Sequence, residues 1–170
     1  MMISRNELYI LCLGIFLFQA NVFAQRDWTG PKGSEPLPEK IQNLERLIDV
    51  IHFPKENDPI KIGQKYYWKH MTSILSKTSE ITITEYGAYL FYDGKWNLRK
   101  SYPLKELDQN FGTKKQKLNQ AEPYTWVQNW RVDGAPYGGW AMWYFIGVTT
   151  DGQTICGYET INTTSNPVNK

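Results

Sequence analysis

The stretch 137-YGGWAMWYFIGV-148 constrains the fold more than any other, because it is apolar on both faces of a strand. Five of its first nine residues are aromatic. Side chains alternate between the two faces of a β-strand. Trp140 therefore falls on one face, and Trp143 and Phe145 on the other. A strand that is apolar on both sides belongs in the middle of a sheet. We predict a central strand at 139–149.

A hairpin is predicted before this strand. Ile81 and Ile83 alternate with threonines, which is typical of a strand. Asp93-Gly94 then supplies the positive φ angles of a two-residue turn within 88–100. This turn places Phe91 opposite Trp96 and Tyr89 opposite Leu98.

Two more strands are predicted towards the end of the chain. In 124–132, alternation puts Tyr124, Trp126, Trp130 and other residues on one face. Asp151-Gly152 is a second hairpin turn, which joins 139–149 to a strand at 153–161. The expected partners across it are Val148 with Ile155 and Phe145 with Tyr158.

Three segments have helical spacing. Ile41, Leu44 and Ile48 recur at intervals of three and four after Pro38, which predicts a helix over 38–52. The same period predicts a helix over 64–77. A short helix between Pro103 and Gly112 has proline at its start and glycine at its stop.

The resulting expectation is an α+β fold in a single domain, residues 38–162, with two N-terminal helices and one short inserted helix packed on an antiparallel sheet of about five to six strands. A flexible leader (25–37) precedes this domain and a disordered tail (163–170) follows it. The element order over 38–161 resembles the cone-shaped ketosteroid isomerase-like fold. That resemblance implies helices that close a curved sheet into a pocket, and it carries no catalytic residues to this chain.

Residues 1–24 are typical of a secretory signal peptide. Arg5 precedes the eleven-residue apolar run Leu8–Phe18, and Val22-Phe23-Ala24 precedes the expected cleavage point. A membrane span needs about 20 apolar residues, so we expect cleavage rather than stable insertion. The chain is predicted to be exported, to a bacterial periplasm or outside the cell.

Cysteine and charge narrow the candidate partners. After cleavage only Cys156 remains, so no intramolecular disulfide is available and packing must stabilise the fold. Cys156 lies in an apolar pattern typical of a buried, inert thiol. The net charge is +2, and charged residues of both signs are scattered along the chain. This distribution is not typical of a nucleic-acid-binding protein.

The residue patterns of common active sites are missing from the sequence. His52 and His70 are the two histidines, and neither has the spacing of a metal site. Phosphate-loop, dinucleotide-binding and nucleophile-elbow motifs are also missing. We predict no cofactor, no metal and no catalytic residue. One enzymatic route stays open, in which a pocket between sheet and helices holds His70 beside an acid.

The aromatic residues around 133-DGAPYGG-139 form the candidate binding site. Burial in the core is the simpler explanation for most of the rings, since each Trp or Tyr buries about 150–250 Å². Rings beside Arg, Asn and Gln are also typical of recognition surfaces. We therefore select Trp130, Arg131, Tyr137 and Trp140, which flank this glycine-rich bend.

Three functions remain open at this point. The first is a non-enzymatic binding protein that meets another protein through an aromatic surface, such as an inhibitor or immunity partner of a secreted hydrolase or toxin. The second is an isomerase-like cone with a small-molecule pocket. The third is a glycan- or cell-wall-binding module with tryptophans exposed in a row.

Overall fold

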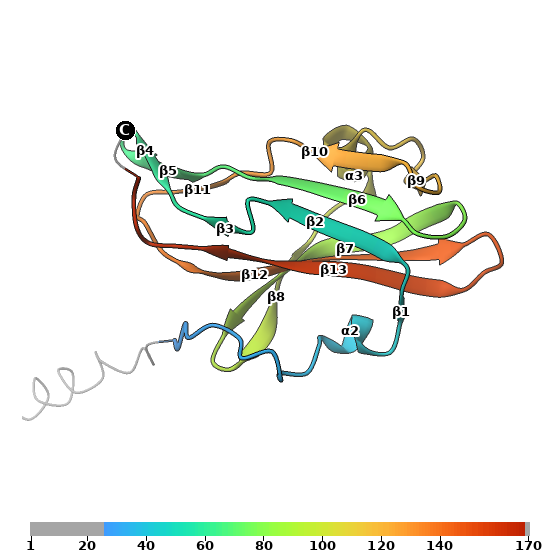
Figure 1. Cartoon of the computed structure of the whole chain (residues 1–170), viewed down its shortest axis with the longest axis horizontal. Helices are drawn as coiled ribbons and strands as arrows, with labels where there is room; N and C mark the ends of the chain where they lie inside the picture. Colours follow the sequence, from blue (N-terminus) through green and yellow to red (C-terminus); the bar gives the residue numbers. More distant parts are fainter. Residues whose placement is uncertain (1–25, 169–170) are drawn as a thin grey trace, which may run out of the picture.

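The computed structural model describes residues 26–168, so the expected signal peptide at 1–24 lies outside the described residues. Most of the described chain is strand (Figure 1). The strands are β1 (Glu45–Arg46), β2 (Ile48–Phe53), β3 (Glu56–Asn57), β4 (Ile60–Ile62), β5 (Lys65–Trp68), β6 (Met71–Ser76), β7 (Ile81–Tyr92), β8 (Lys95–Ser101), β9 (Lys117–Leu118), β10 (Pro123–Trp126), β11 (Arg131–Asp133), β12 (Gly139–Thr149) and β13 (Thr154–Thr163). The helices are α2 (Glu39–Gln42) and α3 (Leu104–Phe111).

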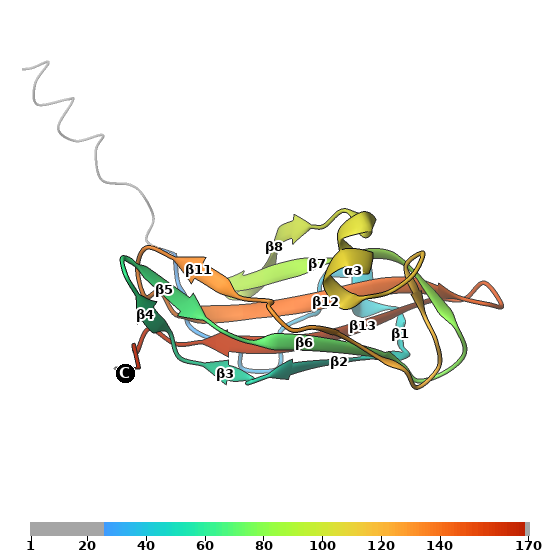
Figure 2. The same cartoon turned by 90° about the horizontal axis from the view of Figure 1, so that it is seen from above.

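The strands form three sheets. The large sheet has the order β1-β13-β12-β7-β8, with β3 also paired to β13 and β9 to β7. The second sheet has the order β10-β6-β2 and the third the order β11-β5-β4. All pairings are antiparallel except those of β13 with β1 and β3. In Figures 1 and 2, β2 and β6 run alongside β12 and β13 as a separate layer.

The main core lies between the large and the second sheet. Ile48 and Ile74 of the second sheet are fully buried and belong to one cluster with Ile83 and Phe145 of the large sheet. Helix α3 adds Phe111, which packs edge-on against Phe145 at 5.6 Å. Apolar burial between two sheets therefore replaces the expected burial of helices on one sheet.

The predicted α+β fold is wrong, because the two N-terminal helices are not present. Only Glu39–Gln42 of the predicted 38–52 is helical, and β1 and β2 follow it. The predicted 64–77 contains β5 and β6. The ketosteroid isomerase-like arrangement fails with them, since it needs these helices to close its pocket.

Buried polar residues explain this error. In β2, burial alternates and the buried positions are Ile48, Val50 and His52. In β6 the buried positions are Thr72, Ile74 and Ser76. Because His, Thr and Ser occupy half of these inward positions, the two-residue period disappears from the hydrophobicity pattern. Ile51 is 54% exposed although it looked like part of a helical face.

The hairpin and short-helix predictions are confirmed. Phe91 pairs with Trp96 and Tyr89 with Leu98 across the Asp93-Gly94 turn. Helix α3 ends at Gly112, whose φ of 75° is left-handed. Strand β12 lies between β13 and β7, as its two apolar faces predicted.

The second hairpin has its predicted strands but a different register. Val148 pairs with Thr154 and Phe145 with Gly157, one residue away from the expected partners. The connection is wider than a two-residue turn, because Thr149 N–H donates to the carbonyl of Gln153.

The predicted strand 124–132 is divided between two sheets. Strand β10 pairs with β6, and β11 pairs with β5. Residues 127–130 connect the two strands without belonging to either. Trp126 and Trp130 therefore do not share one strand face.

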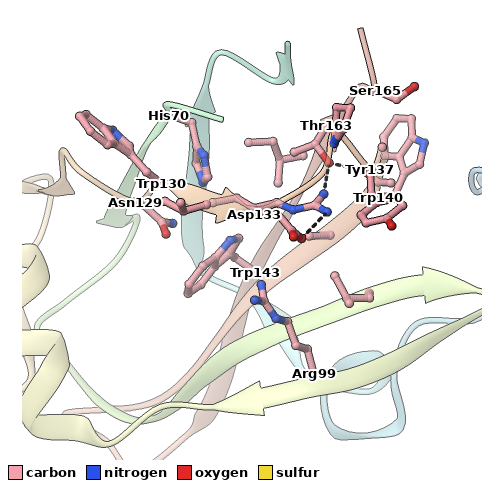
Figure 3. A pocket seen from close by; sticks show the side chains of 18 of the residues that line it. His70, Arg99, Asn129, Trp130, Asp133, Tyr137, Trp140, Trp143, Thr163 and Ser165 are labelled. Carbon is pink, nitrogen blue, oxygen red and sulfur yellow. Dashed lines mark hydrogen bonds and ion pairs between the residues drawn. The ribbon is translucent and has the colours of Figure 1, made fainter. Parts of the chain in front are cut away.

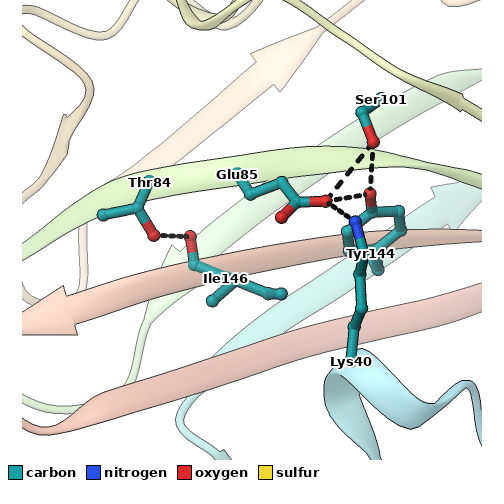
Figure 4. Close-up of polar contacts among 6 residues, drawn as sticks. All are labelled: Lys40, Thr84, Glu85, Ser101, Tyr144 and Ile146. Carbon is teal, nitrogen blue, oxygen red and sulfur yellow. Dashed lines mark hydrogen bonds and ion pairs between the residues drawn. The ribbon is translucent and has the colours of Figure 1, made fainter.

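Helix α2 covers the outer face of the large sheet, where Ile41 packs in a cluster with Tyr144 and Cys156. Figure 4 shows a polar cluster that joins helix and sheet. One oxygen of Glu85 accepts hydrogen bonds from Lys40 Nζ and Tyr144 Oη, both at 2.6 Å. Although partial burial favours the neutral acid, these two hydrogen bonds keep the pKa of Glu85 below its ordinary value.

Candidate functional site

A cavity of about 950 Å³ opens where β8, β11 and β12 approach the bend at 133–139. Its lining is mostly apolar and includes seven Trp and Tyr rings, so we call it the aromatic cavity. Its ring side chains are Trp28, Tyr102, Trp126, Trp130, Tyr137, Trp140 and Trp143. They come from the N-terminal segment (residues 26–38), from the loops and from β10 and β12, so the site exists only in the folded chain.

All four residues selected from the sequence line this cavity. Trp130 directly precedes β11 and is 39% exposed, while Arg131 begins that strand. Tyr137 lies in the bend and is 64% exposed. Trp140, near the start of β12, is half-buried. In Figure 3, Trp130 and His70 lie at one end of the cavity and Tyr137 and Trp140 at the other, with Trp143 and Arg99 on the facing wall.

The facing wall is a rigid stack of rings. Trp143 is only 6% exposed. Tyr102 stacks on it at 5.3 Å with 20° between the planes, and Trp126 meets it edge-on at 5.6 Å. Rings held in this way present a preformed apolar surface whose ordering was completed on folding.

The opposite rim is wetter and carries a positive charge. Lys69 Nζ lies 4.6 Å from the centroid of the Trp130 ring. Such a cation over an indole face is attracted by the negative face of the ring. Trp130 and Tyr137 on this side are both partly exposed to water.

Trp28, which the sequence analysis placed in a flexible leader, forms a further part of the cavity wall. Asp27 N–H donates to Asp93 Oδ1 at 2.8 Å, and Asp93 N–H donates to the carbonyl of Asp27 at 2.7 Å. The Trp28 ring lies 5.3 Å from that of Tyr92. These contacts hold the N-terminal segment on the β7–β8 turn, and Trp28 thereby reaches the cavity. A lone tryptophan among polar and glycine residues was the one sequence signal for this role.

Arg131 is anchored on three sides. Its Nη1 donates to Thr163 Oγ1 at 2.9 Å, and its Nη2 lies 3.6 Å from Asp133 Oδ2. The guanidinium carbon stands 4.3 Å from the Trp68 ring centroid. Burial lowers the pKa of Arg131, and the nearby Asp133 opposes that shift. Arg131 therefore has a fixed position and a partly compensated charge.

Arg99, in β8, lines the same cavity from the facing wall. It is exposed, and no ion pair or hydrogen bond joins its guanidinium to another residue between 26 and 168. Sequence analysis missed Arg99 because an exposed arginine on a hairpin strand looks like ordinary surface charge.

A chain of hydrogen bonds runs inwards from the cavity wall. Asn129 Nδ2 donates to Thr72 Oγ1 at 2.8 Å, and Thr72 Oγ1 contacts His52 Nδ1 at 2.9 Å. His52 Nε2 lies 3.2 Å from the carbonyl of Glu159. Because a carbonyl only accepts, Nε2 carries the proton and Nδ1 accepts from Thr72. Burial lowers the pKa of His52 to about 4, so the ring is neutral at physiological pH.

His70 lines the cavity next to this chain. Its Nδ1 lies 3.3 Å from the carbonyl oxygen of Trp68 and so carries the proton. Nε2 is therefore unprotonated, with a lone pair that can accept a hydrogen bond. Burial lowers the pKa of His70. No hydrogen bond joins His70 to Asp133 in the part of the chain that the structure describes, although both line the cavity.

The bend itself depends on one close approach. A Cβ on Gly138 would stand 3.0 Å from the carbonyl oxygen of Thr163, so glycine lets the bend lie against the end of β13 without a shift of either backbone. This contact brings Tyr137 next to the strand end that also holds Arg131.

Between residues 26 and 168 no cluster of three or more His, Cys, Asp or Glu side chains forms a metal site. No helix in this range is long and apolar enough to cross a membrane. No family model, curated protein or solved structure matches the chain.

Proposed function

We propose that this chain is a non-enzymatic binding protein, exported as its first 24 residues indicate, that takes a ring-bearing ligand into the aromatic cavity. One observation carries the proposal. Seven aromatic side chains from distant parts of the chain converge on one cavity of about 950 Å³, and the rings at its mouth stay partly in water.

The exposed rings have a cost that binding can recover. A Trp or Tyr side chain presents about 150–250 Å². At 39% and 64% exposure, Trp130 and Tyr137 each leave on the order of 100 Å² in water. Covering that area contributes on the order of 2 kcal/mol per ring. The stacked rings of Tyr102, Trp126 and Trp143 on the facing wall add a preformed apolar surface.

The concave shape of the site favours a ligand that enters the cavity rather than a partner protein with a flat binding surface. Small-molecule sites usually have volumes of about 300–1,000 Å³ and combine apolar walls with a few polar groups. The aromatic cavity lies at the upper end of that range. A protein interface of ordinary size needs about 800 Å² on each partner. A small organic molecule or the end of a glycan chain fits the cavity better.

Acid–base catalysis has less support from the geometry. The carboxylate of Asp133 lies 3.6 Å from Arg131 Nη2, and the proton of His70 faces the carbonyl of Trp68. A general base needs to reach the proton that it removes. Asp133 is turned towards Arg131. His70 keeps Nε2 as a free acceptor, but no acid is hydrogen-bonded to this histidine among residues 26–168, so the proposal assigns no catalytic residue.

A ligand screen tests the proposal. Neutral and acidic sugars and small aromatic compounds are titrated into the wild type, the double variant Trp130→Ala/Tyr137→Ala, and the control Phe53→Ala. Phe53 is a 68% exposed ring that does not line the cavity. We expect a compound that binds the wild type and the control equally and the double variant at least tenfold more weakly. Equal binding to all three proteins would place the site elsewhere.

A further inference from the structure

We propose that the aromatic cavity recognises a carboxylate carried on a six-membered ring, with Arg99 and Arg131 holding the acid and the aromatic walls holding the ring. This inference rests on the proposed function and names the class of its ligand. Such a carboxylate occurs in two classes of compound, acidic sugars and aromatic acids. Both combine a carboxylate with a six-membered ring.

The charge of the cavity supports an anion. Its lining contains two guanidiniums, those of Arg99 and Arg131, and one carboxylate, that of Asp133. His70 is neutral at physiological pH because burial lowers its pKa. The lining therefore has an excess of one positive charge, inside walls that are mostly apolar. A low-polarity wall strengthens the attraction of that charge for an anion.

The two arginines have hydrogen-bond donors to spare. A guanidinium offers five N–H groups in a planar fork that matches a carboxylate. Arg131 uses Nη1 on Thr163 and lies within ion-pair distance of Asp133 through Nη2. Arg99 has no such contact with another residue of the described range 26–168. Arg99 is thus the free cation, and Arg131 is the fixed one opposite it.

Both arginines line the same cavity. Arg99 reaches the cavity from β8 beside Trp143, on the wall that faces Asp133 (Figure 3). The positive charge of Arg99 also acts on Arg131, whose pKa it lowers further. An anion bound between two cations reduces the electrostatic repulsion between them. The fork of Arg99 supplies the geometry for a bidentate contact.

The walls explain why the acid is carried on a ring. The face of an aromatic side chain is electron-rich and attracts partly positive C–H edges. One face of a sugar ring presents such C–H groups, and an aromatic acid can stack or meet the wall edge-on. Tyr102 and Trp143, whose planes are only 20° apart, both line the cavity that would receive either ring.

Matched pairs of acids and neutral analogues test the inference. The sugar probes are galacturonate and glucuronate, each against its methyl ester. The aromatic probes are benzoate and phenylacetate, each against its amide. Binding is measured by calorimetric titration at low salt for the wild type, for Arg99→Gln, and for Lys95→Gln. Lys95 is an exposed cation on the same strand that does not line the cavity.

At least one acid should bind the wild type tenfold or more tightly than its neutral analogue. Arg99→Gln should reduce that preference to threefold or less, and Lys95→Gln should keep it. The pair with the larger preference identifies the sugar or the aromatic source. Since removal of the partly buried Arg131 can unfold the chain, Arg131→Lys serves as a second variant, and circular dichroism checks that each variant is folded.

Three results would overturn the inference. Neutral analogues that bind as tightly as the acids would refute the carboxylate but leave the proposed function standing. A preference that survives in Arg99→Gln would refute the role of Arg99. If no probe binds the wild type at millimolar concentration, the inference and the proposed ring-binding function both fail.

Discussion

Lowering the pH should destabilise this protein through His52 in particular. The ring is 2% exposed and contacts Thr72 and the carbonyl of Glu159. Burial is the main reason that its pKa falls from 6.5 to about 4. The unfolded chain therefore takes up a proton more readily than the folded one. The contribution of His52 is complete above the unfolded pKa of 6.5 and is lost as the pH falls towards about 4.

The size of this effect follows from the two pKa values. A tenfold difference in proton affinity is worth about 1.4 kcal/mol. Between about pH 7.5 and about pH 4.5, His52 alone should lower the free energy of unfolding by about 2.5 kcal/mol. That is a large share of the roughly 5–15 kcal/mol by which a domain is stable.

Urea unfolding followed by tryptophan fluorescence measures this loss. The wild type is compared with His52→Gln at both pH values, because glutamine keeps one donor and one acceptor but does not titrate. Carboxylates titrate equally in both proteins and cancel in the comparison. The wild type should lose about 2.5 kcal/mol more than the variant between the two pH values. Equal losses would refute the account of a neutral, buried His52.

Three further predictions follow from the packing. Gly157→Ala should lower the free energy of unfolding by about 2–3 kcal/mol in urea titrations, because a Cβ there would stand 2.5 Å from the Cβ of Ile48. Cys156 is fully buried and burial raises its pKa, so it should react with a thiol reagent only in denaturant; rapid reaction of the folded chain would contradict this. Trp28→Ala should weaken ligand binding in the cavity at least threefold while the thermal midpoint changes little, since the ring is 45% exposed.

Local signals predicted those parts of the fold that depend on local chemistry. Asp93-Gly94 determines a tight turn whatever surrounds it, and the register of Phe91 opposite Trp96 follows from that turn. Gly112 ends α3 for the same kind of reason, because its positive φ suits glycine. Strand β12 was recognisable because both of its faces are apolar.

The prediction for the N-terminal half was wrong because the strands there depend on partners that are far away in the sequence. His52 and Thr72 occupy buried positions that their mutual hydrogen bond helps to make acceptable. Read without that bond, each residue looks like a polar position on a helix. Long-range pairing can override local periodicity in this way, and a single sequence does not reveal it.

The site was only partly visible in the sequence for a related reason. The bend at 133–139 identified Tyr137 and its neighbours through their spacing from glycine and proline. Arg99 and Trp28 reach the same cavity from β8 and from the N-terminal segment. Arg99 has no local pattern that points to the cavity, and Trp28 has only its position as a lone tryptophan in a polar segment. The pairing of β7 with β8 and the docking of the N-terminal segment bring them there.

The seven tryptophans offer the most direct test of the central claim, that ligands bind in the aromatic cavity. Each indole N–H gives its own NMR signal. Five of these residues line the cavity, namely Trp28, Trp126, Trp130, Trp140 and Trp143, while Trp68 and Trp96 do not. Addition of an acid or neutral probe that binds should move signals among the five and leave that of Trp96 in place. Movement of the Trp96 signal alone, or of no signal with any probe, would contradict the claim.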